Sequence, residues 1–463
     1  MAARPHVLIL MTDQQRADCL HCAGHPQLQT PNLDRLAREG TRFAQATTVA
    51  PLCMPARISF ATAVYPHNHG MWANYGEMPA GDDTLFRLLQ HSGYLTALVG
   101  KAHYYVHSAG TDLRQREDFM HARGFEYVHE TTGPSASANT ASYVTQEWAH
   151  KGLWERVKQD HAERLALGGE VVRASPLPVE DYLDSYIGRK AVEFVDAYAD
   201  LRPMCLFVGF GGPHPPMDAP GSYATMYRPQ DTPAPIPIPA KHATRPDWLG
   251  KKYPSQIANP AVFELIAPIR ANYYGKISLI DYRIGCILEA FRNRGWLDDL
   301  CVFFLSDHGE MLGDHGRFGK ASFHESSIRI PLIARWPGRI AANAVTDALV
   351  ESIDIFPTLL EAAGCAPPPQ CLGRSLWPVL RQPTACLRES QLCEIGRGEK
   401  QIMLRTPRHK LAVDSERRAY MLYDVESDPQ EQDNLAGDPA ARGLENELRR
   451  QMQERLEHSR YAP

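Results

Sequence analysis

The stretch HVLILM-TDQQ, residues 6–15, decides the fold. Its first part is a mostly apolar run with the length of a buried strand, and it leads directly into an acid, Asp13. A buried strand that stops at an acid places that acid at the carboxyl edge of a sheet, where open α/β folds bind ligands. We therefore expect Asp13 and Gln14 to lie at such an edge.

A second stretch of the same form, LCVFFL-SDHGE, occupies residues 300–310. It would bring Asp307 and His308 to the same edge. Carboxylates, an amide oxygen and an imidazole can together hold a divalent cation, and oxygen donors suit Ca²⁺, Mg²⁺ or Mn²⁺. A single Asp after a strand is as often a turn or cap residue, but two such strands favour a metal site.

Residues 53–57, CMPAR, combine a thiol, a proline and a fixed cation. Pro55 suits the first position of a helix, which we predict to continue to residue 63. Cys53 would then precede the helix N-terminus, where free amides favour an anion, and Arg57 could offer a forked donor to its oxygens. The alternative is an ordinary buried cysteine.

Further cations follow other apolar segments. Lys101 and His103 end a strand-like segment and would point to the same side if the chain stays extended. His214 lies in a loop stiffened by prolines, and Lys320 ends a glycine-rich loop. Each alone would be an ordinary solvated side chain, but their recurrence after apolar strands indicates one anion-binding site.

The Cys-x-Pro-x-Arg pattern of residues 53–57 resembles the maturation signature of type I sulfatases, in the alkaline-phosphatase-like superfamily. The resemblance implies that a separate maturation enzyme oxidises Cys53 to formylglycine, whose hydrated aldehyde (gem-diol) is the nucleophile. Ala56 stands where the family more commonly has Ser. The choice of maturation enzyme therefore stays open.

The resemblance also implies a metal site. Its ligands would be Asp13, Gln14, Cys53, Asp307 and His308. Gln14 stands where many relatives have a second Asp, and His308 where several have Asn. Ca²⁺ is the ion that the family implies, and Mn²⁺ or Mg²⁺ would also suit these ligands.

The remaining roles follow from the same resemblance. Lys101 and His103 would bind the sulfate and the formylglycine hydroxyl, and Arg57 would hold the formylglycine. His214 and Lys320 would protonate or neutralise the leaving oxygen. Asp307 would also accept a proton from the gem-diol.

We thus expect a sulfatase that hydrolyses aryl, alkyl or carbohydrate sulfate monoesters. A phosphonate monoesterase or phosphodiesterase of the same superfamily is the first alternative, because Gln14, His308 and the pocket residue Asn74 resemble that group. Such enzymes tend to carry Tyr and Thr where this chain has Lys101 and His103. A catalytically silent binding protein is the second alternative, although it would be expected to lack Cys53 or a metal acid.

The chain has 463 residues, of which 44% are hydrophobic, and a net charge of −5. It can bury a large core. Alternating strands and helices predict a large, mainly parallel or mixed sheet with helices on both faces. We expect a catalytic domain over residues 1–366, with an insertion at 110–180. Residues 367–463 would form a smaller α+β subdomain with a short antiparallel sheet and a terminal helix, and residues 422–435 resemble that part of sulfatases.

The charge balance does not favour nucleic acid as a partner. No apolar run approaches transmembrane length and no signal peptide is seen, so a cytoplasmic enzyme without membrane contact is expected. Its partners would be a small-molecule sulfate ester and the maturation enzyme, while a homo-oligomer stays open. A proline-rich loop, residues 229–254, is expected to help shape the substrate pocket.

Overall fold

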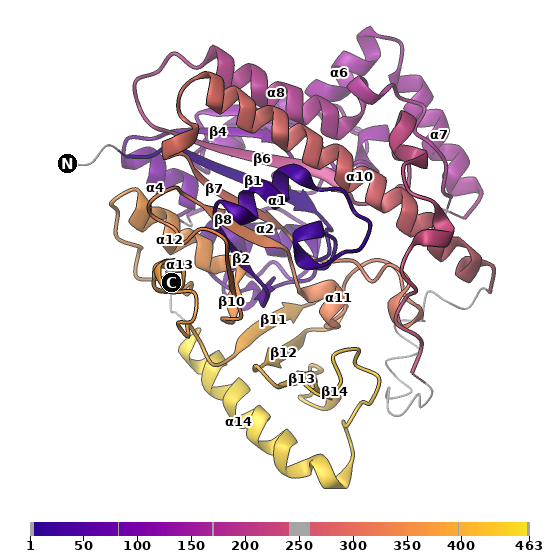
Figure 1. Cartoon of the computed structure of the whole chain (residues 1–463), viewed down its shortest axis with the longest axis vertical. Coiled ribbons are helices and arrows are strands. Elements are labelled where there is room, and N and C mark those ends of the chain that lie inside the picture. Colours follow the sequence, from indigo (N-terminus) through magenta and orange to yellow (C-terminus); the bar gives the residue numbers. More distant parts are fainter. Residues whose placement is uncertain (1–3, 82, 169–170, 240–259, 397, 461–463) are drawn as a thin grey trace.

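An eight-stranded mixed sheet forms the centre of the protein (Figure 1), in a computed structural model that describes residues 4–460 except 82, 169–170, 240–259 and 397. In spatial order its strands are β5 (Tyr127–Glu130), β4 (Leu95–Gly100), β6 (Met204–Pro213), β1 (Val7–Asp13), β7 (Cys301–Ser306), β8 (Leu332–Arg335), β2 (Thr41–Phe43) and β9 (Ala344–Thr346). The first five run parallel to one another, and β8 is antiparallel to β7 and β2. The predicted sheet is confirmed.

Strand β1 lies between β6 and β7, and all of its residues are buried. Successive side chains of a strand point to opposite faces, so Val7, Ile9 and Met11 join one core and Leu8 and Leu10 join the other. Burial on both faces explains why the strand is a continuous apolar run.

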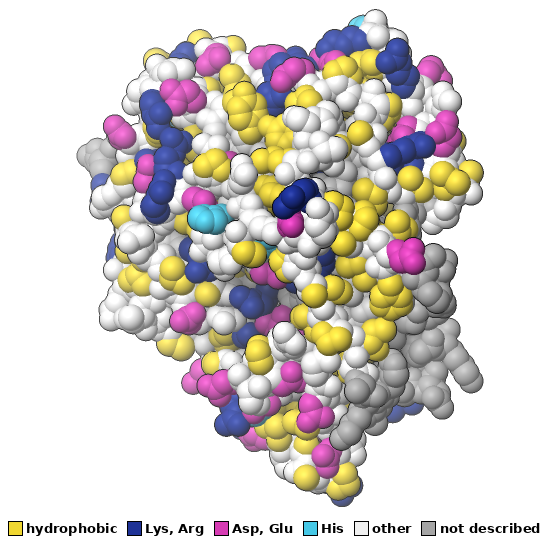
Figure 2. All heavy atoms as spheres, turned by 45° about the vertical axis from the view of Figure 1, so that its right-hand side comes forward, with side chains coloured by type: hydrophobic (Ala, Val, Ile, Leu, Met, Phe, Trp, Pro, Cys, Tyr) yellow, Lys and Arg dark blue, Asp and Glu magenta, His cyan; other side chains and the backbone are white. Residues whose placement is uncertain are grey.

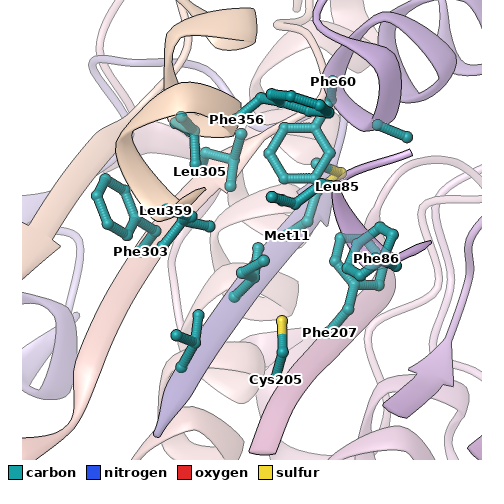
Figure 3. Packing of buried hydrophobic residues seen from close by; sticks show 14 of the residues in the cluster. Met11, Phe60, Leu85, Phe86, Cys205, Phe207, Phe303, Leu305, Phe356 and Leu359 are labelled. Carbon is teal, nitrogen blue, oxygen red and sulfur yellow. The ribbon is translucent and has the colours of Figure 1, made fainter. Parts of the chain in front are cut away.

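Helices α2 (Cys53–Thr62), α4 (Leu85–His91) and α12 (Ile355–Ala362) pack on one face of the sheet. Figure 3 shows how their side chains meet those of β1, β6 and β7; the labelled residues are Met11, Phe60, Leu85, Phe86, Cys205, Phe207, Phe303, Leu305, Phe356 and Leu359. Helix α2 is buried over its whole length. The sheet and these helices therefore hold the Cys53 segment inside the protein.

Helices α1 (Pro31–Arg38), α8 (Leu183–Ala197) and α10 (Pro260–Asn293) cover the other face. Ile280, Ile284 and Ile287 of α10 recur at helical spacing and pack into this second core. Pro268 lies inside α10.

Residues 110–180 contain α5 (Glu117–His121), α6 (Tyr143–His150) and α7 (Trp154–Ala166). They also contain β5, which pairs with β4 as an edge strand of the large sheet. This segment therefore extends the sheet as well as covering it, and its description as an insertion stays a prediction.

The C-terminal part is a four-stranded antiparallel sheet of β11 (Gln391–Ile395), β12 (Gln401–Arg405), β13 (His409–Val413) and β14 (Ala419–Asp424), with helix α14 (Arg442–His458) packed against it. The predicted subdomain is confirmed. Helix α13 (Trp377–Arg381) instead packs into the core of the large sheet, so the boundary at residue 367 stays a prediction. Short elements complete the fold: α3 (Pro66–His69), α11 (Glu325–Ile328), β3 (Ala46–Thr47) and β10 (Val350–Glu351).

The surface carries charges of both signs. Figure 2 shows Lys and Arg side chains interspersed with Asp and Glu over one face, rather than gathered into one basic surface. None of the helices in the described ranges combines the length and apolar character needed to cross a membrane. Part of the proline-rich loop, residues 240–254, lies outside the described residues.

A buried ion cluster joins the two parts of the chain. Arg388 is 3% exposed and pairs with Glu351 and Asp354 at the start of α12. Tyr65 donates a hydrogen bond to Glu351 Oε2 at 2.6 Å, and Arg455 of α14 lies 3.1 Å from Glu351 Oε1. Two cations of the C-terminal part, Arg388 and Arg455, therefore neutralise the carboxylates that precede α12.

Replacing Arg388 with Ala should lower the free energy of unfolding by about 3–5 kcal/mol, because the buried carboxylate of Asp354 loses its cation and that of Glu351 keeps only Arg455. Denaturant unfolding measures this change. Arg292→Ala is the control, since Arg292 forms an exposed pair with Glu289 and its loss should cost less than about 0.5 kcal/mol. Equal effects of both substitutions would contradict the cluster's structural role.

Candidate active site

The carboxyl ends of β1 and β7 bring two pairs of predicted site residues together. Thr12 lies opposite Ser306 in the parallel register. The chain turns sharply at Gln14, whose φ is 72°, a conformation uncommon for residues other than glycine. The turn is fixed by Asp307 Oδ1, which accepts hydrogen bonds from the Gln14 N–H at 3.0 Å and the His308 N–H at 2.9 Å.

Helix α2 begins at Cys53, so the prediction that Pro55 is its first residue and that Cys53 precedes it was wrong. The first N–H groups of a helix have no intrahelical acceptor, and a proline is therefore tolerated within the first turn. The helix start still directs Cys53 into the site. Its Sγ lies 3.2 Å from His308 Nε2, 3.2 Å from Lys320 Nζ and 3.7 Å from Asp13 Oδ1.

Four buried side chains could hold a metal ion. Asp13, Cys53, Asp307 and His308 each offer one ligand atom, and these atoms lie within 4.8 Å of one another. His308 Nδ1 lies 2.9 Å from the Gly309 carbonyl oxygen, which leaves Nε2 facing the site. The donor set fits a divalent cation.

Arg57 and Lys101 neutralise the acids of this cluster. Arg57 lies 2.7 Å from Asp307 Oδ2 and 3.4 Å from Asp13 Oδ2, and it donates to the Lys101 carbonyl oxygen at 2.7 Å. Lys101 Nζ pairs with Asp13. A Cβ atom at Gly133 would lie 3.0 Å from Lys101 Nζ, so glycine at this position leaves room for the lysine.

The charges determine which groups stay ionised. Burial raises the pKa of Asp13, but Lys101, His214, Lys320 and Arg57 lower it well below its usual range. Burial lowers the pKa of Lys320, but negative charge on Cys53 and Asp13 outweighs this and raises it. Lys320 therefore stays a cation in the site.

Lys320 also contacts Gln14. Its Nζ donates to Gln14 Oε1 at 2.5 Å, in addition to its contact with Cys53. The glycine-rich loop before Lys320 thus ends in the site, where the sequence pattern placed it. The Gln14 amide nitrogen donates to Glu310.

His103 and His214 border the cluster. Lys101 and His103 were expected to point to the same side if the chain stayed extended, and this condition is not met, because β4 ends at Gly100 and His103 has a φ of 60°. Burial and the Lys101 charge lower the pKa of His103 well below its usual value. Burial and the Lys320 charge do the same for His214, whose Nδ1 lies 2.7 Å from the Pro215 carbonyl oxygen. Both shifts favour the neutral form of the imidazole.

Asn74 lies outside the buried cluster. Its side chain is exposed, and its Oδ1 accepts a hydrogen bond from the Met54 N–H at 2.9 Å. It thus satisfies one of the free amides in the first turn of α2.

The sequence reasoning missed the residues that hold the His214 loop. Lys276 of α10 donates to the carbonyl oxygens of His214 at 2.5 Å and Pro216 at 2.9 Å. Asp184 of α8 accepts hydrogen bonds from the backbone of Gly211 and Gly212 at 2.8 and 3.0 Å. A lysine inside the apolar pattern of α10 was the available signal for Lys276, whereas Asp184 gave none.

Together, the sheet edge, the helix that presents Cys53 and the surrounding cations define the class of α/β enzyme whose site has the charges to hold an anion and the donors to hold a metal ion. Comparisons with known proteins agree with this class. The family model described as "Sulfatase" matches residues 5–365, and the model "N-sulphoglucosamine sulphohydrolase, C-terminal" matches residues 313–458. The chain belongs to the sulfatase family, in the alkaline-phosphatase-like superfamily.

Individual relatives cover almost the whole chain. An arylsulfatase of Clostridium perfringens is 28% identical, over 93% of this chain and 90% of its own. The multifunctional alkaline phosphatase superfamily protein PehA of Trinickia caryophylli is 30% identical, over 95% of this chain and 93% of its own. Among solved structures, the phosphonate monoester hydrolase of Agrobacterium radiobacter superposes with a TM-score of 0.80, at 25% identity over 99% of this chain and 96% of its own.

The Cys53 thiol should ionise near neutral pH in metal-free, unconverted protein. Burial and Asp13 raise its pKa, but Lys320, Lys101 and His308 lower it to about 7. The thiolate should therefore form as the pH rises through about 7. The ultraviolet difference spectrum between this protein and its Cys53→Ala variant measures its formation. Lys320→Met should move the midpoint upward. A midpoint at or above the ordinary value of 9.0 would contradict the described electrostatics.

Proposed function

We propose that this protein hydrolyses sulfate monoesters after Cys53 is converted to formylglycine by a maturation enzyme. One observation carries the proposal: Cys53 opens a buried helix with its sulfur 3.2 Å from both Lys320 and His308 and near Asp13. Formylglycine supplies a hydroxyl nucleophile. A sulfate held here would meet several cations, which stabilise charge as it develops in the transition state.

The side chains suggest a division of roles. Lys101 and Arg57 hold one side of the site through Asp13 and Asp307. Lys320 stays charged and is placed to neutralise the leaving oxygen. His214 is neutral without ligand, so it can act as an acid only when the charge of a bound sulfate offsets the neighbouring lysines. We assign protonation of the leaving oxygen to His214 and Lys320.

We further propose that one divalent cation binds to Asp13, Gln14, Cys53, Asp307 and His308. Ca²⁺ is the ion implied by the family resemblance. His308 contributes nitrogen and Gln14 contributes no charge, and both features also suit Mn²⁺. Mg²⁺ is the third candidate.

Adding the bound cation to protein stripped with EDTA should raise Tm, because a ligand that binds only the folded state stabilises it. Differential scanning fluorimetry with Ca²⁺, Mn²⁺ and Mg²⁺ ranks the three. Asp13→Asn should abolish the rise, whereas Asp298→Asn, at an exposed position, should not. No rise with any of the ions would overturn the metal proposal.

Phosphonate monoester hydrolysis is the competing function. The phosphonate monoester hydrolases of Agrobacterium radiobacter and Silicibacter pomeroyi both superpose on nearly the whole chain. Lys101 and His103 favour sulfate, since a resemblance to phosphonate monoesterases would predict Tyr and Thr there. Aryl, alkyl and carbohydrate sulfates all stay candidates, and release of sulfate from a panel of such esters would rank them.

The mature enzyme should hydrolyse p-nitrophenyl sulfate faster than phenyl phenylphosphonate, in initial rates at matched concentrations. Lys101→Ala should lower kcat/KM for the sulfate by about 10²–10³, the range for loss of one transition-state donor. Lys158→Ala, at a surface position, is the control and should keep full activity. Much faster turnover of the phosphonate would instead identify a phosphonate hydrolase.

A further inference from the structure

Glu310 is a buried carboxylate that none of the roles above uses. It follows β7, is 2% exposed, and both of its oxygens accept hydrogen bonds. Oε2 accepts from the Gln14 side-chain amide. Oε1 accepts from the backbone N–H groups of Leu312, at 3.0 Å, and Gly319. Glu310 therefore connects a candidate metal ligand to both ends of the loop that precedes Lys320.

The carboxylate fixes which way the Gln14 amide points. An ionised carboxylate only accepts hydrogen bonds, so it must face the NH₂ group of an amide. The oxygen of Gln14 is thereby turned toward Lys320, whose Nζ lies 2.5 Å away. An amide oxygen has two lone pairs, which allows it to accept from Lys320 and also face a cation.

The same carboxylate holds the loop that carries Lys320. Gly319 precedes Lys320 directly, and the Met311 N–H also donates to the Gly319 carbonyl oxygen at 2.7 Å. Lys320 then reaches Cys53 at 3.2 Å. Glu310 thus supports the neutral side chain of Gln14 on one side and the charged Lys320 on the other.

We propose that Glu310 is a positioning residue that orients Gln14 as a neutral, oxygen-donating ligand of the cation and places Lys320 beside Cys53. This inference rests on the proposed metal site. An Asp at position 14 would bring a second buried carboxylate toward Glu310, which is unfavourable without an added cation. In the Gln14–Glu310 pair, the negative charge instead lies on Glu310, which contacts the proposed ligand Gln14 and is not itself a ligand of the metal.

The role of the Gln14–Glu310 pair can be tested by changing which of the two positions carries the carboxylate and which carries the amide. In Glu310→Gln, the new amide oxygen can still accept from the Leu312 and Gly319 backbone, but its NH₂ group then faces the NH₂ group of Gln14. Gln14 must flip and turn its own NH₂ group toward Lys320 and the metal. The double variant Gln14→Glu/Glu310→Gln restores a donor facing an acceptor, with the charge now at position 14.

Titration calorimetry of EDTA-stripped protein with Mn²⁺ and Ca²⁺ measures the effect. Glu310→Gln should weaken binding by about 10–100-fold, the usual effect of losing a residue that orients a metal ligand. The double variant should bind at least as tightly as the wild type. Glu426→Gln, at an exposed position, is the control.

Two results would overturn the inference. One is cation affinity in Glu310→Gln within twofold of the wild type, even if its Tm in EDTA falls, because Glu310 would then only stabilise the loop. The other is a double variant that binds as weakly as Glu310→Gln while its Tm in EDTA matches the wild type. If the wild type itself bound no cation, the metal proposal would fail and this inference would fail with it. That result is distinguishable from the two above, because in both of them the wild type binds the cation.

Discussion

The site depends on the ion pairs that Arg57 makes with Asp13 and Asp307. Two carboxylates at the ends of neighbouring parallel strands, both fully buried, would repel each other without a cation between them. Arg57 contacts both and also the backbone of Lys101. Because Arg57 lies one turn after Cys53 on a buried helix, the interaction that neutralises the strand ends also places the reactive residue.

Local patterns predicted the fold well, because the central strands are buried on both faces and are therefore apolar throughout. The ends of β1 and β7 could be predicted to meet, since parallel strands place their carboxyl ends on one edge. Local rules failed where long-range contacts determine the backbone. Helix α2 begins at Cys53 rather than Pro55, and His103 leaves the extended conformation directly after β4. Asp184 and Lys276 support the His214 loop from distant helices. The lysine within an apolar helix pattern marked Lys276 as unusual, but no local pattern connects either residue with this loop.

The electrostatics separate the cations into two kinds. Lys320 keeps its charge because it faces negative groups, whereas His103 and His214 lose theirs because burial and neighbouring lysines act together. An anion entering the site would therefore meet fixed charge first and would itself change the protonation of the histidines. Solved structures of a phosphonate monoester hydrolase and of a sulfatase share this fold, so the fold alone does not distinguish the two functions.

The central claim is that Cys53 is a precursor and not an ordinary thiol. The most direct test is the mass of the proteolytic peptide that contains Cys53, from protein produced together with a formylglycine-generating enzyme. Our account predicts the mass of the aldehyde, or of its hydrate, at this position. A peptide that keeps the thiol under conditions where a known sulfatase is converted would contradict it.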